Sequence, residues 1–229
     1  MSAILSKKEA QQVLEKLMVL FPDAHCELEH RNPYELLIAT ILSAQCTDVR
    51  VNQTTKTLFP KYPTPQHLAK ADPAELEQDI HEVGLFRTKA KNIRHTAQIL
   101  VSEYGGVVPN DREKLMSLPG VGRKTANVVL SNAFGVPAIA VDTHVFRVSN
   151  RIGLSRSTTP EQCEQDLQAL LPKDRWSLAH HLLIFQGRRM CKAKSPDCAA
   201  CPLKEHCLFY RGAGSGKRGA AKDGGNRAK

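Results

Sequence analysis

A tight connection between two helices is predicted by the sequence Leu118-Pro119-Gly120-Val121-Gly122-Arg123-Lys124-Thr125. Pro119 ends the preceding helix, and Gly120 and Gly122 permit backbone torsions that are closed to residues with a Cβ atom. The amides of such a turn, placed before the N-terminus of the next helix, form a site for a phosphate oxygen. The sequence therefore predicts a hairpin that contacts a phosphate backbone through Gly120, Val121, Gly122 and Arg123, with an ordinary helical turn as the alternative.

Helical patterns continue from this hairpin in both directions. Ser6 and Glu9 form a capping-box pattern ahead of apolar residues at helical spacing, and Asn32-Pro33 is typical of a helix start. We find no convincing period-two alternation between hairpin turns, which would indicate strands. The chain is therefore predicted to be all-α, with helices at residues 7–21, 33–41, 48–60, 66–70, 73–82, 86–103, 111–117, 123–134, 143–152, 160–170 and 174–187.

The chain is strongly basic. Its 229 residues include 32 Lys and Arg against 23 Asp and Glu, a formal net charge of +9. Excess positive charge favours nucleic acid, because each neutralised phosphate releases condensed counterions; a solvated basic surface is the alternative. No apolar stretch reaches the ~20 residues of a membrane span, and the N-terminus lacks the apolar core of a secretory signal. We expect a cytoplasmic protein with no membrane partner.

Four cysteines are clustered with the spacing Cys191-x6-Cys198-x2-Cys201-x5-Cys207. Only one C-x-x-C pair is present, whereas a zinc ribbon usually has two, so zinc is less attractive. Four thiolates from a short irregular loop can hold an iron-sulfur cubane, with fortuitous thiols as the alternative. The pattern predicts an iron-sulfur centre, and the nearby Lys192 and Lys194 would give its loop a basic surface for phosphates.

Two residues near the hairpin carry possible catalytic chemistry. Lys124 lies in the first turn of the predicted helix 123–134, where an amine can act as a nucleophile, although most lysines after such a turn only contact phosphate. Asp142 follows a short apolar run and precedes the predicted helix 143–152, where a plain N-cap is the alternative to a catalytic carboxylate. Neither residue by itself establishes catalysis.

Four motifs together resemble the endonuclease III family. They are the hairpin 118–125, the segment Val141-Asp142-Thr143-His144, the four-cysteine pattern and the segment Leu42-Ser43-Ala44-Gln45-Cys46-Thr47-Asp48, in that family's order and spacing. The resemblance covers roughly residues 6–209. It implies a helix-hairpin-helix DNA glycosylase with AP lyase activity in base excision repair, and an all-α fold of two helical domains with a DNA-binding cleft between them. It also implies a [4Fe-4S] cluster held by Cys191, Cys198, Cys201 and Cys207.

The resemblance also implies roles for individual residues. The family's nucleophile falls on Lys124 and its catalytic carboxylate on Asp142, so Lys124 would attack C1′ and the strand would be nicked by β-elimination. Gln45 would fill the gap left by the flipped nucleotide. Leu85 would wedge into the opposite strand, with ordinary core packing as the alternative. Cys46 stands where the family often has alanine.

The same resemblance predicts interleaved domains. Residues 26–136 would form a six-helix barrel that contains the hairpin, and residues 1–25 with 137–211 would form the iron-sulfur domain. Residues 212–229 are rich in glycine and basic side chains and would form a flexible tail.

The substrate that the resemblance implies is double-stranded DNA with oxidised pyrimidines or abasic sites, bound by a monomer associated with the nucleoid. Two rivals are considered. One is an adenine-removing relative, which generally lacks the lysine and has an additional C-terminal domain, so Lys124 and the short tail argue against it. The other is a noncatalytic helix-hairpin-helix module that only binds DNA.

Overall fold

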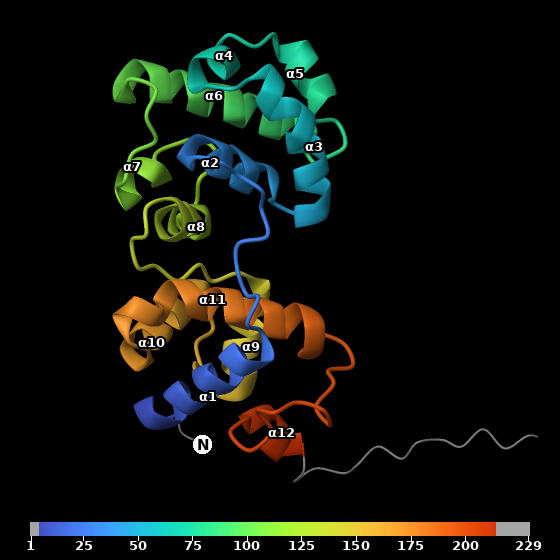
Figure 1. Ribbon diagram of the computed structural model, residues 1–229, viewed down its shortest axis with the longest axis vertical. Coiled ribbons are helices and arrows are strands. Elements are labelled where there is room, and N and C mark those ends of the chain that lie inside the picture. The colour runs from blue at the N-terminus through green and yellow to red at the C-terminus, as the bar shows by residue number, and fades with distance from the viewer. Residues whose placement is uncertain (1–4, 214–229) are drawn as a thin grey trace, which may run out of the picture.

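The computed structural model describes residues 5–213, and every regular element among them is helical, which confirms the all-α prediction. The helices form two units that lie one above the other (Figure 1). The first unit contains α2 (Pro33–Leu42), α3 (Asp48–Lys61), α4 (Pro65–Ala69), α5 (Pro73–Asp79), α6 (Phe86–Tyr104), α7 (Arg112–Met116) and α8 (Arg123–Ala133). The second unit contains α1 (Lys7–Leu20), α9 (Thr143–Ile152), α10 (Pro160–Leu170), η1 (Lys173–Arg175), α11 (Trp176–Phe185), η2 (Gln186–Met190) and α12 (Leu208–Ala213).

The helix starts follow from short-range hydrogen bonds. The Ser6 side chain accepts from the Glu9 amide while the Glu9 carboxylate accepts from the Ser6 amide, so the predicted capping box forms. Asn32 Oδ1 accepts a 2.9 Å hydrogen bond from the Glu35 amide, and Pro33 occupies the first turn. These contacts satisfy first-turn amides that have no partner within the helix, which is why the starts could be predicted locally.

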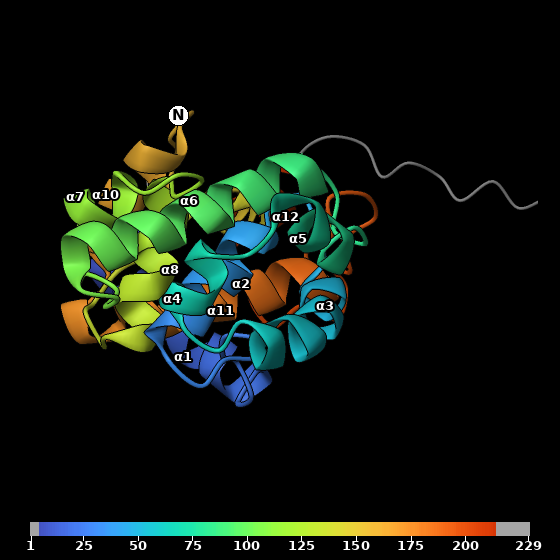
Figure 2. The same ribbon diagram turned by 90° about the horizontal axis from the view of Figure 1, so that it is seen from above.

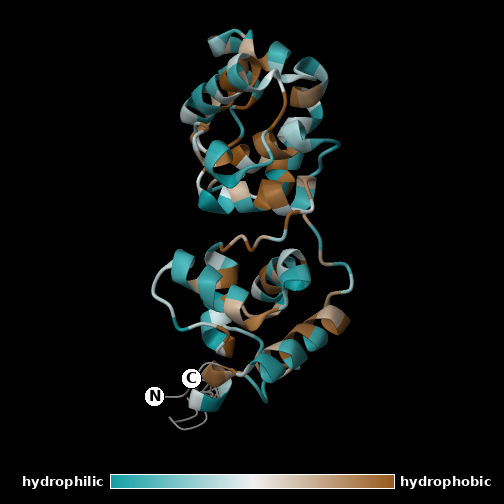
Figure 3. Ribbon diagram, turned by 90° about the vertical axis from the view of Figure 1, so that its left-hand side faces the viewer, coloured by the Kyte–Doolittle hydropathy of each residue, from teal (hydrophilic) through white to brown (hydrophobic). Residues whose placement is uncertain are grey.

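Each unit has its own hydrophobic core. Buried side chains between residues 28 and 140 form the first core, and those from residues 5–21 and 139–203 form the second. Hydrophobic residues accordingly gather inside each unit (Figure 3). Seen from above, α4 and α6 lie side by side over α2, which closes the first core (Figure 2). The domain boundaries at residues 25–26 and 136–137 stay a prediction, which this division supports.

The segment that joins the units serves both cores. Ala138 and Ala140 pack into the first core, whereas Ile139 and Val141 pack into the second. The Asn127 side chain of α8 donates a 2.8 Å hydrogen bond to the Ile139 carbonyl and so ties the segment to the first unit. Because the segment is held on both sides, the residue that follows it, Asp142, is fixed at the junction.

Several predicted boundaries need correction. Helix α5 ends at Asp79 rather than residue 82, and the predicted helix 174–187 is a 3₁₀ turn, an α-helix and a π-helical segment in succession. Helix α12 was not predicted, and it includes the first two residues of the predicted tail. The other tail residues, 214–229, lie outside the described part of the chain. Within residues 5–213, no helix has the length and apolarity needed to cross a membrane.

Candidate active site

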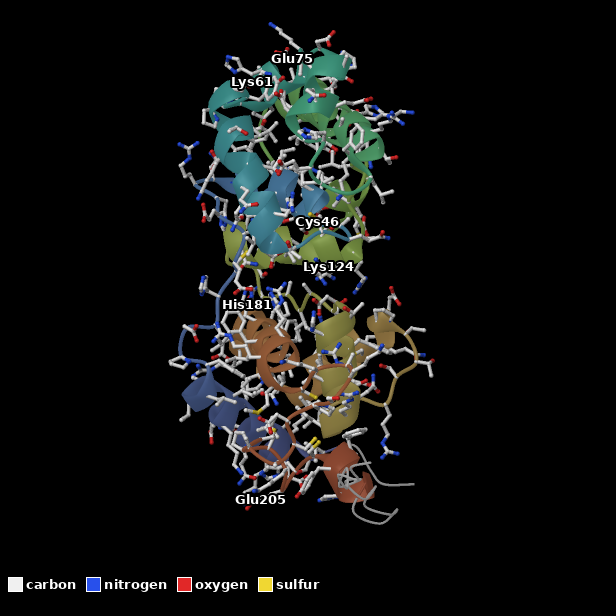
Figure 4. The ribbon with its side chains drawn as sticks, turned by 90° about the vertical axis from the view of Figure 1, so that its right-hand side faces the viewer. Cys46, Lys61, Glu75, Lys124, His181 and Glu205 are labelled. Carbon is white, nitrogen blue, oxygen red and sulfur yellow. The ribbon has the colours of Figure 1, made fainter. Side chains whose placement is uncertain are left out.

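Lys124 and Asp142 line the same two cavities at the junction of the helical units. One cavity is also lined by Gln45 and Cys46 of the loop after α2, and the other by His181 of α11. Figure 4 shows Lys124 and Cys46 at the edge of the first unit and His181 at the facing edge of the second. The fold therefore brings together the two residues that the sequence marked as nucleophile and carboxylate.

Lys124 is the second residue of α8. The helix is preceded by Gly122 at its N-cap, which provides no side-chain acceptor for the first-turn amides. These amides and the helix dipole therefore favour an anion beside the lysine. Because its helix is part of the first core, the lysine backbone is fixed while its side chain reaches the junction.

Asp142 is the N-cap of α9. Its Oδ1 accepts a 2.8 Å hydrogen bond from the Val145 amide. The N-cap interpretation is thus correct, but it does not exclude the catalytic one, because the capping bond uses one oxygen of a carboxylate that also lines both cavities. The same hydrogen bond orients the side chain toward the junction.

The hairpin between α7 and α8 requires one of its two glycines. Gly120 has φ +79°, a conformation that is strained for residues with a Cβ atom, and a Cβ there would lie 2.9 Å from Asn92 Nδ2, so the Asn92 side chain would have to shift. Gly122 has φ −90° and open space around it, which any residue could adopt. The prediction that both glycines permit torsions closed to other residues is therefore wrong for Gly122.

Two residues of the hairpin have partners within the protein. The Val121 side chain is buried in the first core and its amide donates to the Leu118 carbonyl, so its predicted DNA contact could use only its carbonyl group. The Arg123 guanidinium is paired with the buried Glu164 of α10. Arg123 Nε and Nη2 both donate to Glu164, so the guanidinium is held toward α10, and its predicted contact with DNA stays a prediction.

Gln45 and Leu85 share an unusual backbone conformation. Their φ angles are 53° and 59°, in the left-handed region that side chains with a Cβ rarely adopt. Their loops are adjacent, since a Cβ on Gly84 would lie 3.8 Å from the Gln45 carbonyl oxygen. Leu85 is 61% exposed, so the core-packing alternative is wrong. Strain of this kind is concentrated at functional sites, where the surrounding structure holds it in place.

Sequence reasoning missed Arg188, which lines both cavities from the second unit. Its guanidinium donates a 2.7 Å hydrogen bond to Asp48 and another to Glu27. It lies in the π-helical segment η2, a type of distortion that is frequent at functional sites. The only sequence signal was a pair of arginines ahead of the first clustered cysteine.

Two adjacent histidines of α11, His180 and His181, line the smaller of the two junction cavities. His181 Nε2 lies 2.8 Å from Asn132 Oδ1 of α8, which links the two units. Burial lowers the pKa of His181 to about 4 and also lowers the pKa of His180. Both rings are therefore neutral near pH 7, and they supply a wall without positive charge behind Lys124.

The four clustered cysteines line one cavity of the second unit, beside apolar residues that include Ile152 and Leu203. Two N–H groups are directed at sulfur atoms: Arg151 Nη1 lies 3.6 Å from Cys191 Sγ, and Gln186 Nε2 lies 3.4 Å from Cys201 Sγ. Four thiols around an apolar space, with hydrogen-bond donors to sulfur, fit the donor set of an iron-sulfur cluster.

The loop between the first two of these cysteines is held in place from outside. Arg151 donates hydrogen bonds to the carbonyls of Lys192 and Ala193, at 2.7 and 2.9 Å. The side chains of Lys192 and Lys194 are exposed. The loop thus presents two ammonium groups on a restrained backbone, as the phosphate-contact prediction requires.

Comparisons with known proteins agree with this geometry. Residues 38–173 match the family of HhH-GPD superfamily base excision DNA repair proteins, and residues 191–207 match the iron-sulfur binding domain of endonuclease III. Endonuclease III of Bacillus subtilis is 54% identical over 89% of this chain and 94% of its own length. That of Escherichia coli K12 is 43% identical over 90% of this chain and 97% of its own length.

A solved structure of a trapped covalent intermediate between an endonuclease III and DNA has the same fold. It is 53% identical, has a TM-score of 0.88, and the match covers 92% of this chain and 99% of that one. High identity over nearly the whole of each protein excludes similarity of fold alone. The chain therefore belongs to the endonuclease III family of HhH-GPD base excision DNA repair proteins.

Proposed function

We propose that Lys124 and Asp142 perform the reaction of a bifunctional DNA glycosylase and AP lyase of base excision repair. The observation that carries this assignment is their shared position on both junction cavities. A noncatalytic module that only binds DNA would need the basic hairpin. It would not need a lysine and a carboxylate that line the same cavities between two domains.

The lysine supplies the nucleophile. Lys124 Nζ, as a neutral amine, attacks C1′ of the flipped nucleotide as the N-glycosidic bond breaks and the base departs. The resulting Schiff base acidifies the 2′ hydrogens. Loss of one of them to a base expels the 3′ phosphate, which nicks the strand, and water then releases the lysine.

The carboxylate supplies charge stabilisation. An ionised Asp142 opposes the positive charge that develops at C1′ and assists removal of a proton from Lys124. Its capping bond to Val145 holds the side chain in place before substrate arrives, so no reorganisation is needed during the reaction.

The proposed substrate is double-stranded DNA in which the enzyme flips an oxidised pyrimidine or an abasic nucleotide into the junction. Flipping costs a few kcal/mol and is easiest for damaged or poorly paired bases. Gln45 would fill the gap left by the flipped nucleotide, and Leu85 would wedge into the opposite strand. Gly120, Lys192 and Lys194 would contact phosphates. We propose a monomer as the active form, because Lys124 and Asp142, the two residues that would carry the reaction, come together within a single fold.

The direct test uses a duplex oligonucleotide with one abasic site. The enzyme should nick it without added metal ions, and borohydride should trap a covalent complex by reducing the Schiff base. A duplex with thymine glycol should give base release and nicking. Binding to the abasic duplex with neither nicking nor trapping would favour the binding module instead.

We expect Leu85→Gly to raise stability and lower activity. Glycine tolerates φ 59° without strain, and an exposed side chain contributes little packing, so the free energy of unfolding should rise by about 1 kcal/mol. Loss of the wedge should slow single-turnover base release by about tenfold if it supplies ~1.4 kcal/mol toward flipping. Chemical denaturation and rapid-quench rates measure the two effects.

The matched control for this change is Leu85→Ala, which removes the wedge but keeps a Cβ atom at a positive φ. Activity should fall in the same way, whereas stability should not rise. A loss of stability in the glycine variant would restore the core-packing interpretation of Leu85.

The chain holds a [4Fe-4S] cluster through Cys191, Cys198, Cys201 and Cys207, the segment that matches the iron-sulfur binding domain. When bound, the cluster cross-links a loop of irregular backbone that would otherwise lack a core. We expect about four irons per chain and a yellow-brown colour. Cys198→Ser should lose iron and soluble yield, whereas Cys26→Ser, a thiol outside the group, should retain both. Zinc in place of iron and sulfide would contradict this prediction.

A further inference from the structure

The hairpin and α10 are joined by an ion pair that the function above leaves unused. Arg123 Nε donates a 2.7 Å hydrogen bond to Glu164 Oε2, and Arg123 Nη2 donates a 3.2 Å bond to Glu164 Oε1. The pair is therefore bidentate, which fixes the planes of both groups as well as their distance.

The acidic partner is taken out of water. The Glu164 side chain is 3% exposed, and Gln168 Nε2 donates a further 3.1 Å hydrogen bond to Oε1. A buried carboxylate without its cation is strongly unfavourable, so the pair is held much more firmly than an ion pair on the surface. Arg123 is thus an anchored residue rather than a mobile cation.

The ion pair between Arg123 and Glu164 connects the helix that carries Lys124 to the second unit. Arg123 is the first residue of α8 and directly precedes Lys124. Glu164 lies on α10, which packs against α9, the helix that Asp142 caps. The ion pair therefore closes a loop of contacts that runs from the lysine through α10 and α9 to the carboxylate.

We propose that Glu164, acting through Arg123, is a positioning residue that holds Lys124 in reach of the substrate C1′ and of Asp142 across the junction. This inference rests on the proposed roles of Lys124 and Asp142. Each of those residues is fixed to its own unit, and the ion pair is a side-chain contact that couples the start of α8 to the second unit. Misplacement of reacting groups by about 1 Å can cost about 100-fold in rate.

The test variant is Glu164→Gln, which keeps the size and an acceptor oxygen but removes the charge. Its matched control is Glu161→Gln, which removes the same charge from an exposed position one turn earlier on α10. With abasic duplex and enzyme in excess, we expect the borohydride trapping rate to fall about ten- to hundred-fold for Glu164→Gln and less than about twofold for Glu161→Gln.

Two further measurements separate positioning from a general loss of structure. The final amount of trapped complex should equal that of the wild-type enzyme, because a misfolded fraction would lower the amplitude rather than the rate. Binding to an uncleavable tetrahydrofuran duplex should be unchanged. Arg123→Lys keeps the charge but loses the bidentate geometry, so it should slow trapping in the same way. If Glu164→Gln does not fold, Arg123→Lys replaces it as the test variant.

Other results would overturn the inference. Equal trapping rates in the wild type, Glu164→Gln and Arg123→Lys would show that the pair does not position the lysine. A different pair of results would assign Arg123 to a phosphate contact instead. Glu164→Gln would then bind DNA more tightly, and the dependence of log K on log[salt] for Arg123→Gln would be shallower by the amount that one phosphate contact contributes. If the wild-type enzyme neither nicks nor traps, the proposed function itself fails, which is a different outcome.

Discussion

Lys124→Gln should lose the ability to form a covalent complex with DNA. Borohydride trapping on an abasic duplex should fall below detection, and strand nicking should decrease by at least about 10³-fold, because glutamine has no nucleophilic amine. DNA binding should persist, since the hairpin and the exposed lysines of the cysteine loop are unchanged. Single-turnover nicking and a gel assay for the trapped complex measure the two effects.

A suitable control is Lys114→Gln on α7, the other helix of the hairpin, because it removes the same charge from an exposed side chain. It should trap at the wild-type rate and bind somewhat more weakly at most. Efficient trapping of Lys124→Gln would show that a different amine is the nucleophile and would remove the basis of the proposed mechanism.

Asp142→Asn should separate catalysis from folding. Asparagine is as good an N-cap as aspartate, so the hydrogen bond to the Val145 amide and the helical circular dichroism should survive. The loss of charge should slow single-turnover base release by about 10²- to 10⁴-fold. Affinity for undamaged duplex should not decrease, because the substitution removes a negative charge from a surface that faces phosphates.

The structure offers a second N-cap aspartate as the control. Asp111 caps α7 through a 2.9 Å bond from the Lys114 amide to Oδ1, and it lies outside both junction cavities. Asp111→Asn should leave base release within about twofold of the wild type. If both asparagine variants lost structure, or if neither lost activity, Asp142 would be an N-cap only.

Sequence patterns predicted most of the helices, because a helix start depends on neighbours within one turn. Ser6 with Glu9 and Asn32 with Glu35 form the bonds that their spacing indicates. The prediction was less accurate where tertiary packing sets the helix ends: α5 is shorter than expected, and the last two residues of the predicted helix 174–187 belong to the π-helical segment Gln186–Met190, which delivers Arg188 to the junction.

The candidate site was predictable only in part. The residue types at 124 and 142 and the spacing of the four cysteines can be read from the chain, whereas only the structure shows that the turn needs glycine at 120 and not at 122. Side-chain partners could not be predicted in this way: the Val121 side chain packs in the core and Arg123 pairs with Glu164, while the DNA contacts assigned to both residues stay predictions. A basic residue next to a phosphate-binding turn looks the same in sequence whether or not a buried carboxylate approaches it.

The sequence by itself determined the all-α class, the hairpin and the metal-binding donor set, because these depend on hydrogen bonds, torsions and spacings within a few residues. Only the tertiary structure decided that Lys124 and Asp142 share two cavities and that Leu85 is exposed on a strained backbone. It also decided the pairing of Arg188 with Asp48, which is 140 residues away. The physical reason is that these features depend on how two hydrophobic cores pack against a shared segment, and burial of that kind is set by contacts between distant parts of the chain.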